Sequence, residues 1–196
     1  MSKAIRRILF TFGYVAAGLV AVVAVGGLTY HRQLLHFPEP MLSLLLLGLT
    51  GALIYASVQM DGPGYTVPVI VLSFLARVVL SPRSYSLVAA AIYTLIVGLA
   101  LIAGAYVQKS LTGLKFGRFI SMGLAVGVGY ALMTLALLSM LGAKSGLDAV
   151  WVQGLLGVKL GAAMGLGFEL IDLIGPRPEV ELYPPPSSLD NAEDAS

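Results

Sequence analysis

The sequence predicts an all-α protein, a polytopic membrane bundle of about six transmembrane helices with small-residue, GxxxG-like packing. Hydrophobic residues make up 58% of the 196 residues and charged residues only 11%. A typical soluble domain has about 25% charged residues, so this chain has too few to cover a water-exposed surface. Its apolar residues also stand in long runs without the polar alternation of barrel strands, which indicates helices that cross a bilayer core roughly 30 Å thick.

Six apolar segments are candidate spans, namely residues 8–29, 41–60, 65–80, 86–107, 118–141 and 149–174. Five of them reach the roughly 17–25 residues that a spanning helix needs. The third is shorter and lies between Gly62-Pro63-Gly64 and Ser81-Pro82. It predicts either a short span or a re-entrant segment buried in protein. The first segment is longer than the core of a cleavable signal peptide, about 7–15 residues, so we expect a retained helix.

The chain divides into a transmembrane helical domain, residues 1–175, and a tail, residues 176–196. The tail is acidic and proline-rich, which predicts a disordered cytoplasmic segment. The alternative is a docking peptide around its run of three prolines. Basic residues are more numerous on the side of the membrane where the N-terminus lies, which predicts that this side is cytoplasmic. With six spans, both termini are then cytoplasmic. We expect the protein to lie in the cell (inner) membrane. The inner side has Lys3, Arg6, Arg7, Lys109, Lys115, Arg118 and Arg177, and the outer side has Arg32, Arg77, Arg83 and Lys144.

Glycines recur at every fourth position of two segments. Gly157, Gly161 and Gly165 form one narrow stripe on the last segment, and Gly123 and Gly127 have the same spacing on the fifth. Small residues let helix backbones approach each other in lipid, where no hydrophobic force brings helices together. The stripes therefore predict close helix packing inside the bundle. The alternative is that they dock a partner subunit.

Lys159 is a charged residue inside a long apolar segment, and the apolar pattern does not account for its charge. It lies ten residues into the last segment, about 15 Å from its start and close to the middle of the hydrocarbon core. A charge at that depth is costly, so Lys159 is a candidate substrate-binding residue. No carboxylate is predicted at the same depth. Backbone carbonyls, water, a bound anion or mid-helix polar groups would have to satisfy it, among them Thr50, Ser73, Tyr93, Thr94, Tyr130 and Thr134. At 100° per residue Lys159 points away from the glycine stripe, which favours the alternative of a tolerated structural charge.

The other charged residues lie nearer the predicted interfaces. Glu169 and Asp172 are three residues apart, so they form an interfacial acidic pair that we expect to reach water. They could instead bind a cation or the arginine of a partner. Arg77 lies three residues from the end of its segment, and we expect its long side chain to extend to the interface. His31 and His36 fall in the first predicted loop and do not indicate a metal site.

These features favour a small-solute transporter, or the membrane-embedded subunit of one. Segments 1–3 and 4–6 have a faint similarity, with Arg77 and Lys159 in corresponding helices, as in inverted-repeat transporters. The alternative is a non-catalytic accessory, assembly or scaffold subunit of a larger membrane complex. We see no paired nucleophile and base, so an enzyme is disfavoured, and we expect no metal or cofactor. The expected partners are the lipid bilayer and further subunits or a homo-oligomer. The small net charge disfavours nucleic acid.

Overall fold

The chain forms a bundle of helices in a computed structural model that describes residues 3–34, 38–60, 65–80, 87–110, 116–142 and 146–174. These residues form six helices and no strand: α1 (Lys3–Leu34), α2 (Pro38–Met60), α3 (Thr66–Leu80), α4 (Leu87–Ser110), α5 (Gly117–Met140) and α6 (Leu147–Ile174). All except α3 are long and apolar enough to cross a membrane. The predicted fold class, an all-α membrane helix bundle, is therefore confirmed.

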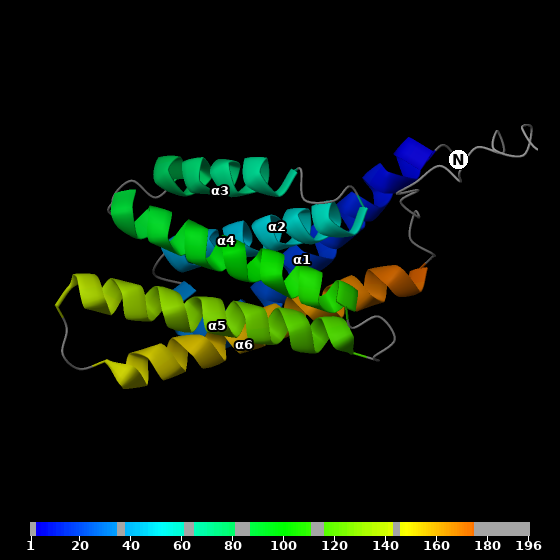
Figure 1. The fold of residues 1–196 in the computed structure, drawn as a ribbon. Helices are drawn as coiled ribbons and strands as arrows, with labels where there is room; N and C mark the ends of the chain where they lie inside the picture. Colours follow the sequence, from blue (N-terminus) through cyan, green and yellow to red (C-terminus); the bar gives the residue numbers. More distant parts are fainter. Residues whose placement is uncertain are drawn as a thin grey trace, which may run out of the picture.

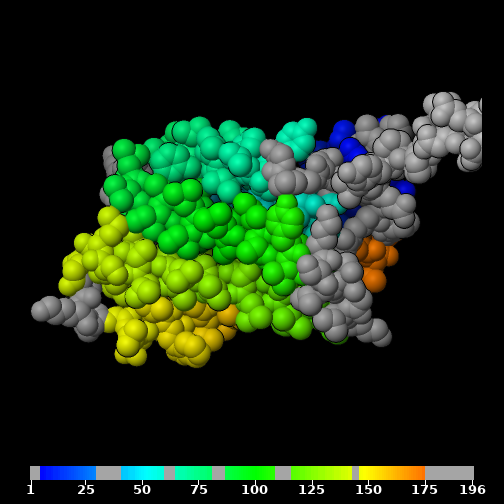
Figure 2. All heavy atoms as spheres, in the orientation of Figure 1, coloured from blue at the N-terminus to red at the C-terminus, as the bar shows by residue number. Residues whose placement is uncertain are grey.

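The helices run alongside one another, as Figure 1 shows. The most extensive contact joins α5 and α6, and α1 lies against both α2 and α6. Within the described residues, α3 contacts α2 and α4 alone, so it forms one edge of the bundle. The beginning of α1, the beginning of α5 and the end of α6 lie at the same end of the bundle. Figure 2 shows the face on which the side chains of α3, α4 and α5 lie side by side.

The polarity of α3 is the reverse of that in a water-soluble helix. Its two buried residues are both polar, Thr66 and Arg77. Large apolar side chains cover its outer side, with Val67 and Val79 each more than 60% exposed. A bundle in water would turn these surfaces the other way, because exposed apolar area is unfavourable there. The arrangement suits a helix that faces hydrocarbon on its outer side.

Glycines lie where α5 and α6 come closest. A Cβ atom added at Gly157 would lie 2.6 Å from the carbonyl oxygen of Val126, and one added at Gly161 would overlap the carbonyl of Met122. Gly165 faces the backbone of Arg118 in the same way. On the other helix, Gly123 and Gly127 lie against residues 154–162 of α6. These glycines allow a backbone-to-backbone approach that a larger side chain would prevent.

Three details refine the predicted segments. The segment 65–80 forms one unbroken helix about 22 Å long, so the chain does not turn back within Thr66–Leu80. Residues 30–34, which follow the first predicted span, continue α1, and this includes the backbone of His31. His36 and the tail, residues 176–196, lie outside the described residues.

Candidate functional site

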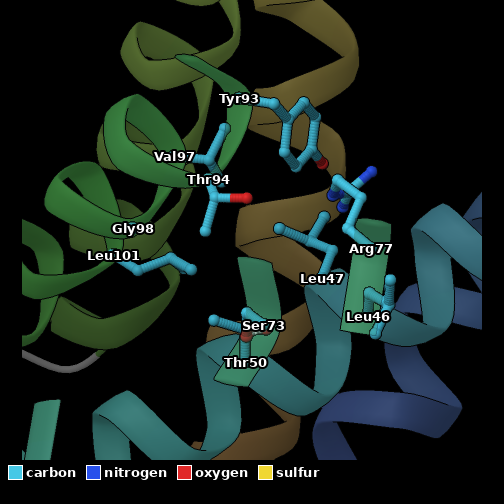
Figure 3. Close-up of a pocket in the computed structure, with 10 residues that line it drawn as sticks. All are labelled: Leu46, Leu47, Thr50, Ser73, Arg77, Tyr93, Thr94, Val97, Gly98 and Leu101. Carbon is cyan, nitrogen blue, oxygen red and sulfur yellow. Dashed lines mark hydrogen bonds between the residues drawn. The ribbon is translucent and has the colours of Figure 1, made fainter. Parts of the chain in front are cut away.

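A small cavity with a few polar groups on a mostly apolar wall lies between α2, α3 and α4 (Figure 3). Its space of about 20 Å³ exceeds the roughly 10–15 Å³ that one water molecule requires. The polar groups on its wall come from all three helices, and aliphatic side chains fill the gaps between them. The lining residues are Leu46, Leu47, Thr50, Ser73, Arg77, Tyr93, Thr94, Val97, Gly98 and Leu101.

Arg77 supplies the positive charge of this cavity. Its side chain is 4% exposed, and its guanidinium carbon lies 3.8 Å from the centroid of the Tyr93 ring. Its Nη1 donates a hydrogen bond of 3.3 Å to the Ser43 hydroxyl on α2. The expectation that Arg77 extends to the interface is therefore wrong, because the side chain turns into the bundle, where an aromatic face and a hydroxyl receive it.

The Tyr93 ring is held in place by a tyrosine from another helix. The hydroxyls of Tyr93 and Tyr130 are 2.8 Å apart, and both residues are buried. Their rings meet edge to face, with centroids 5.9 Å apart. This contact links α4 to α5 and fixes the aromatic face against which Arg77 rests.

Thr94 has a buried hydroxyl that makes no hydrogen bond in the structure. Figure 3 shows its oxygen directed into the space between α3 and α4. Helical hydroxyls usually bond the carbonyl four residues earlier, as Thr134 does to Tyr130 at 2.8 Å and Ser139 does to Leu135 at 2.8 Å. Buried polar groups without a partner are rare and costly, so the Thr94 hydroxyl marks a place where a polar group fits.

Two further hydroxyls close the cavity below Thr94. The hydroxyl oxygens of Thr50 on α2 and Ser73 on α3 lie 2.5 Å apart and share a hydrogen bond. Figure 3 shows the two side chains together on the side of the cavity away from Tyr93. Ser73 and Arg77 are one turn apart on α3. Both residues of α3 therefore contribute polar groups to the wall of the cavity.

A second polar cluster joins α1, α5 and α6 at the end of the bundle where α6 ends. Arg118 forms a salt bridge with Asp172, and the Tyr14 hydroxyl donates a hydrogen bond to the other carboxylate oxygen. The side chains of Arg118 and Asp172 are 13% and 11% exposed. Arg118 also donates to the carbonyl of Phe168 at 3.3 Å. We call Tyr14, Arg118 and Asp172 the charged clamp, since they tie three helices together.

Glu169 completes the contact by capping α5. Its carboxylate accepts a hydrogen bond of 3.2 Å from the backbone N–H of Arg118, in the first turn of α5. The residue before the helix, Phe116, has a left-handed backbone and no side-chain cap of its own. A carboxylate at a helix N-terminus satisfies a free N–H and complements the helix dipole. The sequence led us to expect water around Glu169 and Asp172, whereas the structure gives both carboxylates partners from the same chain.

Lys159 lies apart from both polar groups. It is exposed on the outer face of α6, as are Leu155 and Leu166. Of the six polar residues named as its partners, Thr50, Ser73, Tyr93 and Thr94 surround Arg77 instead. Its assignment as a substrate-binding residue stays a prediction. The direction inferred from the helix angle, away from the glycine stripe, agrees with its exposure.

Sequence reasoning missed Arg77 and Thr94 as members of one site. A signal for Arg77 was present, because Thr66, Ser73 and Arg77 are spaced by seven and four residues. That spacing places all three on one face of an otherwise apolar helix, which indicates a polar stripe turned toward protein. Thr94 had no such signal, since an isolated threonine in a membrane helix commonly bonds its own backbone.

Comparisons with known proteins give no information about this site, so its interpretation rests on its geometry. No family model matches the chain, and no curated protein or solved structure matches it. The fold and the polar groups thus define a class, a multi-pass helical membrane protein with a buried cationic cavity.

Proposed function

We propose that this protein is a small-solute transporter and that the cavity lined by Arg77 and Thr94 is its solute site. The observation that carries the proposal is the unpartnered Thr94 hydroxyl, directed into a cavity that also holds a buried arginine. Solute sites of membrane proteins lie between helices and are lined by a few polar groups in an apolar wall. If the cavity had only a structural role, we would expect the Thr94 hydroxyl to be hydrogen-bonded to another group of the protein.

The position of α3 at the edge of the bundle suggests that it is the moving part. On α2 and α4, Tyr55 and Gln59 both donate to the Oε1 atom of Gln108, at 3.4 and 2.6 Å. Within the described residues, α3 contacts α2 and α4 alone, through its polar residues and through Val69 and Ile70. A displacement of α3 would open the cavity while α2 and α4 stay joined. Hinge and shear motions of this kind are common in ligand exchange.

The chain contains no cysteine, so a disulfide can test this motion without interference. Thr50 and Ser73 are in hydrogen-bond contact, which makes the pair Thr50→Cys and Ser73→Cys close enough to join α2 and α3. The full chain would be reconstituted in liposomes and mixed with hyperosmotic glycerol, urea or potassium chloride with valinomycin. We expect permeation of at least one solute, blocked by oxidation of the double variant and restored by dithiothreitol. Each single-cysteine variant is the matched control. Permeation no faster than through protein-free liposomes, for every solute, would refute transport.

A second function, a non-catalytic subunit of a larger membrane complex, is favoured by Lys159. It lies near the middle of the 28-residue α6 and is exposed, with apolar neighbours on the same face. A charge in that position is unfavourable in lipid, and the carboxylate of a partner helix would neutralise it. Isolation in mild detergent would then recover a partner with the wild-type chain and lose it with Lys159→Met. Equal recovery with both chains would count against this function.

A further inference from the structure

We propose that the cavity at Arg77 binds a small monovalent inorganic anion of about the size of chloride. This inference rests on the proposed function, because it names the class of solute that the site would take. It is argued from three properties of the cavity: its charge, its hydrogen-bond donors and its size.

The charge of the cavity is positive and uncompensated within the described residues. A guanidinium stays protonated in proteins, and Arg77 is 4% exposed. No carboxylate among the described side chains contacts it. The Tyr93 ring and the Ser43 hydroxyl stabilise the cation, but neither carries a negative charge. Buried charges in membrane proteins are normally paired, so an anion is the group that this environment lacks.

One neutral group beside Arg77, the Thr94 hydroxyl, is able to donate a hydrogen bond to an anion. Thr94 is 5% exposed, and its buried hydroxyl has no partner and faces the same space as the guanidinium (Figure 3). Thr11 and Thr29 on α1 behave differently, because each bonds the carbonyl four residues earlier, at 3.0 and 2.9 Å. Thr94 on α4 could bond its own helix in the same way but does not. Its hydroxyl is therefore available to a ligand.

The size and the lining of the cavity restrict the anion. Its space of about 20 Å³ holds roughly one water-sized particle, which a halide matches. Phosphate, a carboxylic acid metabolite and a lipid headgroup are all larger. Leu47, Val97 and Leu101 supply an apolar wall, in which a multiply charged anion would lose more hydration than one arginine could replace. A monovalent ion with a moderate hydration energy fits these limits.

The test measures anion binding by the full chain purified in detergent with sodium gluconate. We expect added sodium chloride to raise the midpoint of thermal unfolding by several degrees, and sodium sulfate at equal ionic strength to raise it far less. Ligands that bind only the folded state stabilise it in proportion to the logarithm of their concentration. The chloride effect should disappear in Arg77→Met and need at least fivefold more chloride in Thr94→Val.

Matched controls separate binding from general effects of charge and polarity. Arg6→Met also removes an arginine that lies over an aromatic ring, that of Phe10 at 6.0 Å, and Thr134→Val removes a hydroxyl bonded to its own helix. Both should keep the chloride response of the wild type. If Arg77→Met does not fold, Thr94→Val and direct titration calorimetry with chloride decide the question. An equal response to chloride and sulfate, or a chloride response that persists in both Arg77→Met and Thr94→Val, would overturn the proposal.

Flux measurements distinguish this inference from the transport function. Chloride binding by the purified chain, with no permeation of chloride, glycerol or urea in liposomes, would uphold the anion site and refute transport. Permeation of glycerol or urea that the disulfide between Thr50→Cys and Ser73→Cys blocks, with no chloride binding, would uphold transport and refute the anion site.

Discussion

The contact between α5 and α6 allows a quantitative test with two glycines of the same helix. A Cβ atom at Gly161 would overlap the carbonyl oxygen of Met122 and lie 2.8 Å from its carbonyl carbon. A Cβ atom at Gly154 would lie 3.4 Å from the Cβ of Ala131 and 3.7 Å from the carbonyl oxygen of Gly127, which are ordinary contacts. We expect Gly161→Ala to force the two backbones apart and Gly154→Ala to be accommodated.

The expected magnitude follows from the difference between the two variants. Alanine is favoured over glycine in a helix interior by about 1 kcal/mol, and this gain applies to both positions. Overpacking adds a cost of about 1–3 kcal/mol at Gly161 alone. The free energy of unfolding of Gly161→Ala should therefore be about 1–3 kcal/mol lower than that of Gly154→Ala.

Equilibrium unfolding in mixed micelles of dodecyl maltoside and sodium dodecyl sulfate, followed by circular dichroism, measures both values. The wild type provides the reference, and Gly154→Ala should equal or exceed its stability. Equal stability of the two alanine variants would show that the close approach of α5 and α6 is not maintained in the protein, and the packing argument would fail.

The remaining predictions concern the charged clamp and the topology. Asp172→Asn should lower the free energy of unfolding by about 3–5 kcal/mol, because it leaves the charge of Arg118 buried without its partner. The double variant Arg118→Met, Asp172→Leu should recover part of this loss, and a double-variant cycle with no coupling would contradict the clamp. Reporter fusions at residue 196 and within residues 108–117 should both report a cytoplasmic location, and an external signal at either position would refute the topology.

The long helices could be predicted from the sequence because a bilayer imposes a minimum apolar length on each span. The fifth segment, predicted as 118–141, forms Gly117–Met140. The spacing of Gly157, Gly161 and Gly165 likewise predicted a narrow stripe, since a helix places every fourth residue on one face. These properties depend on neighbours within about two turns, and such local information is present in a single sequence.

The clamp and the cavity depend on contacts between distant segments, which a single sequence does not specify. Arg118 was counted among the basic residues of the inner side, whereas it pairs with Asp172, 54 residues later in the chain. Arg77 and Lys159 were both recognised as charges in apolar segments, yet one faces the interior and the other faces outward. The sequence shows how far along its helix each of the two residues lies. Whether its side chain faces the interior or the outside depends on which helices pack beside that helix.

The reversed polarity of α3 has a consequence for how the protein is assembled during synthesis. Arg77 rests on Tyr93, which belongs to the following helix, and bonds Ser43 of the preceding one. When α3 leaves the ribosome, α4 has not yet emerged, so the arginine lacks its aromatic partner at the moment of insertion. An arginine at the centre of an inserting helix costs about 2.5–3.5 kcal/mol on translocon scales, and this is an upper limit for Arg77, which lies in the last turn of α3. We therefore expect α3 to wait at the translocon or the interface and to enter the bilayer together with α4, as one helical hairpin.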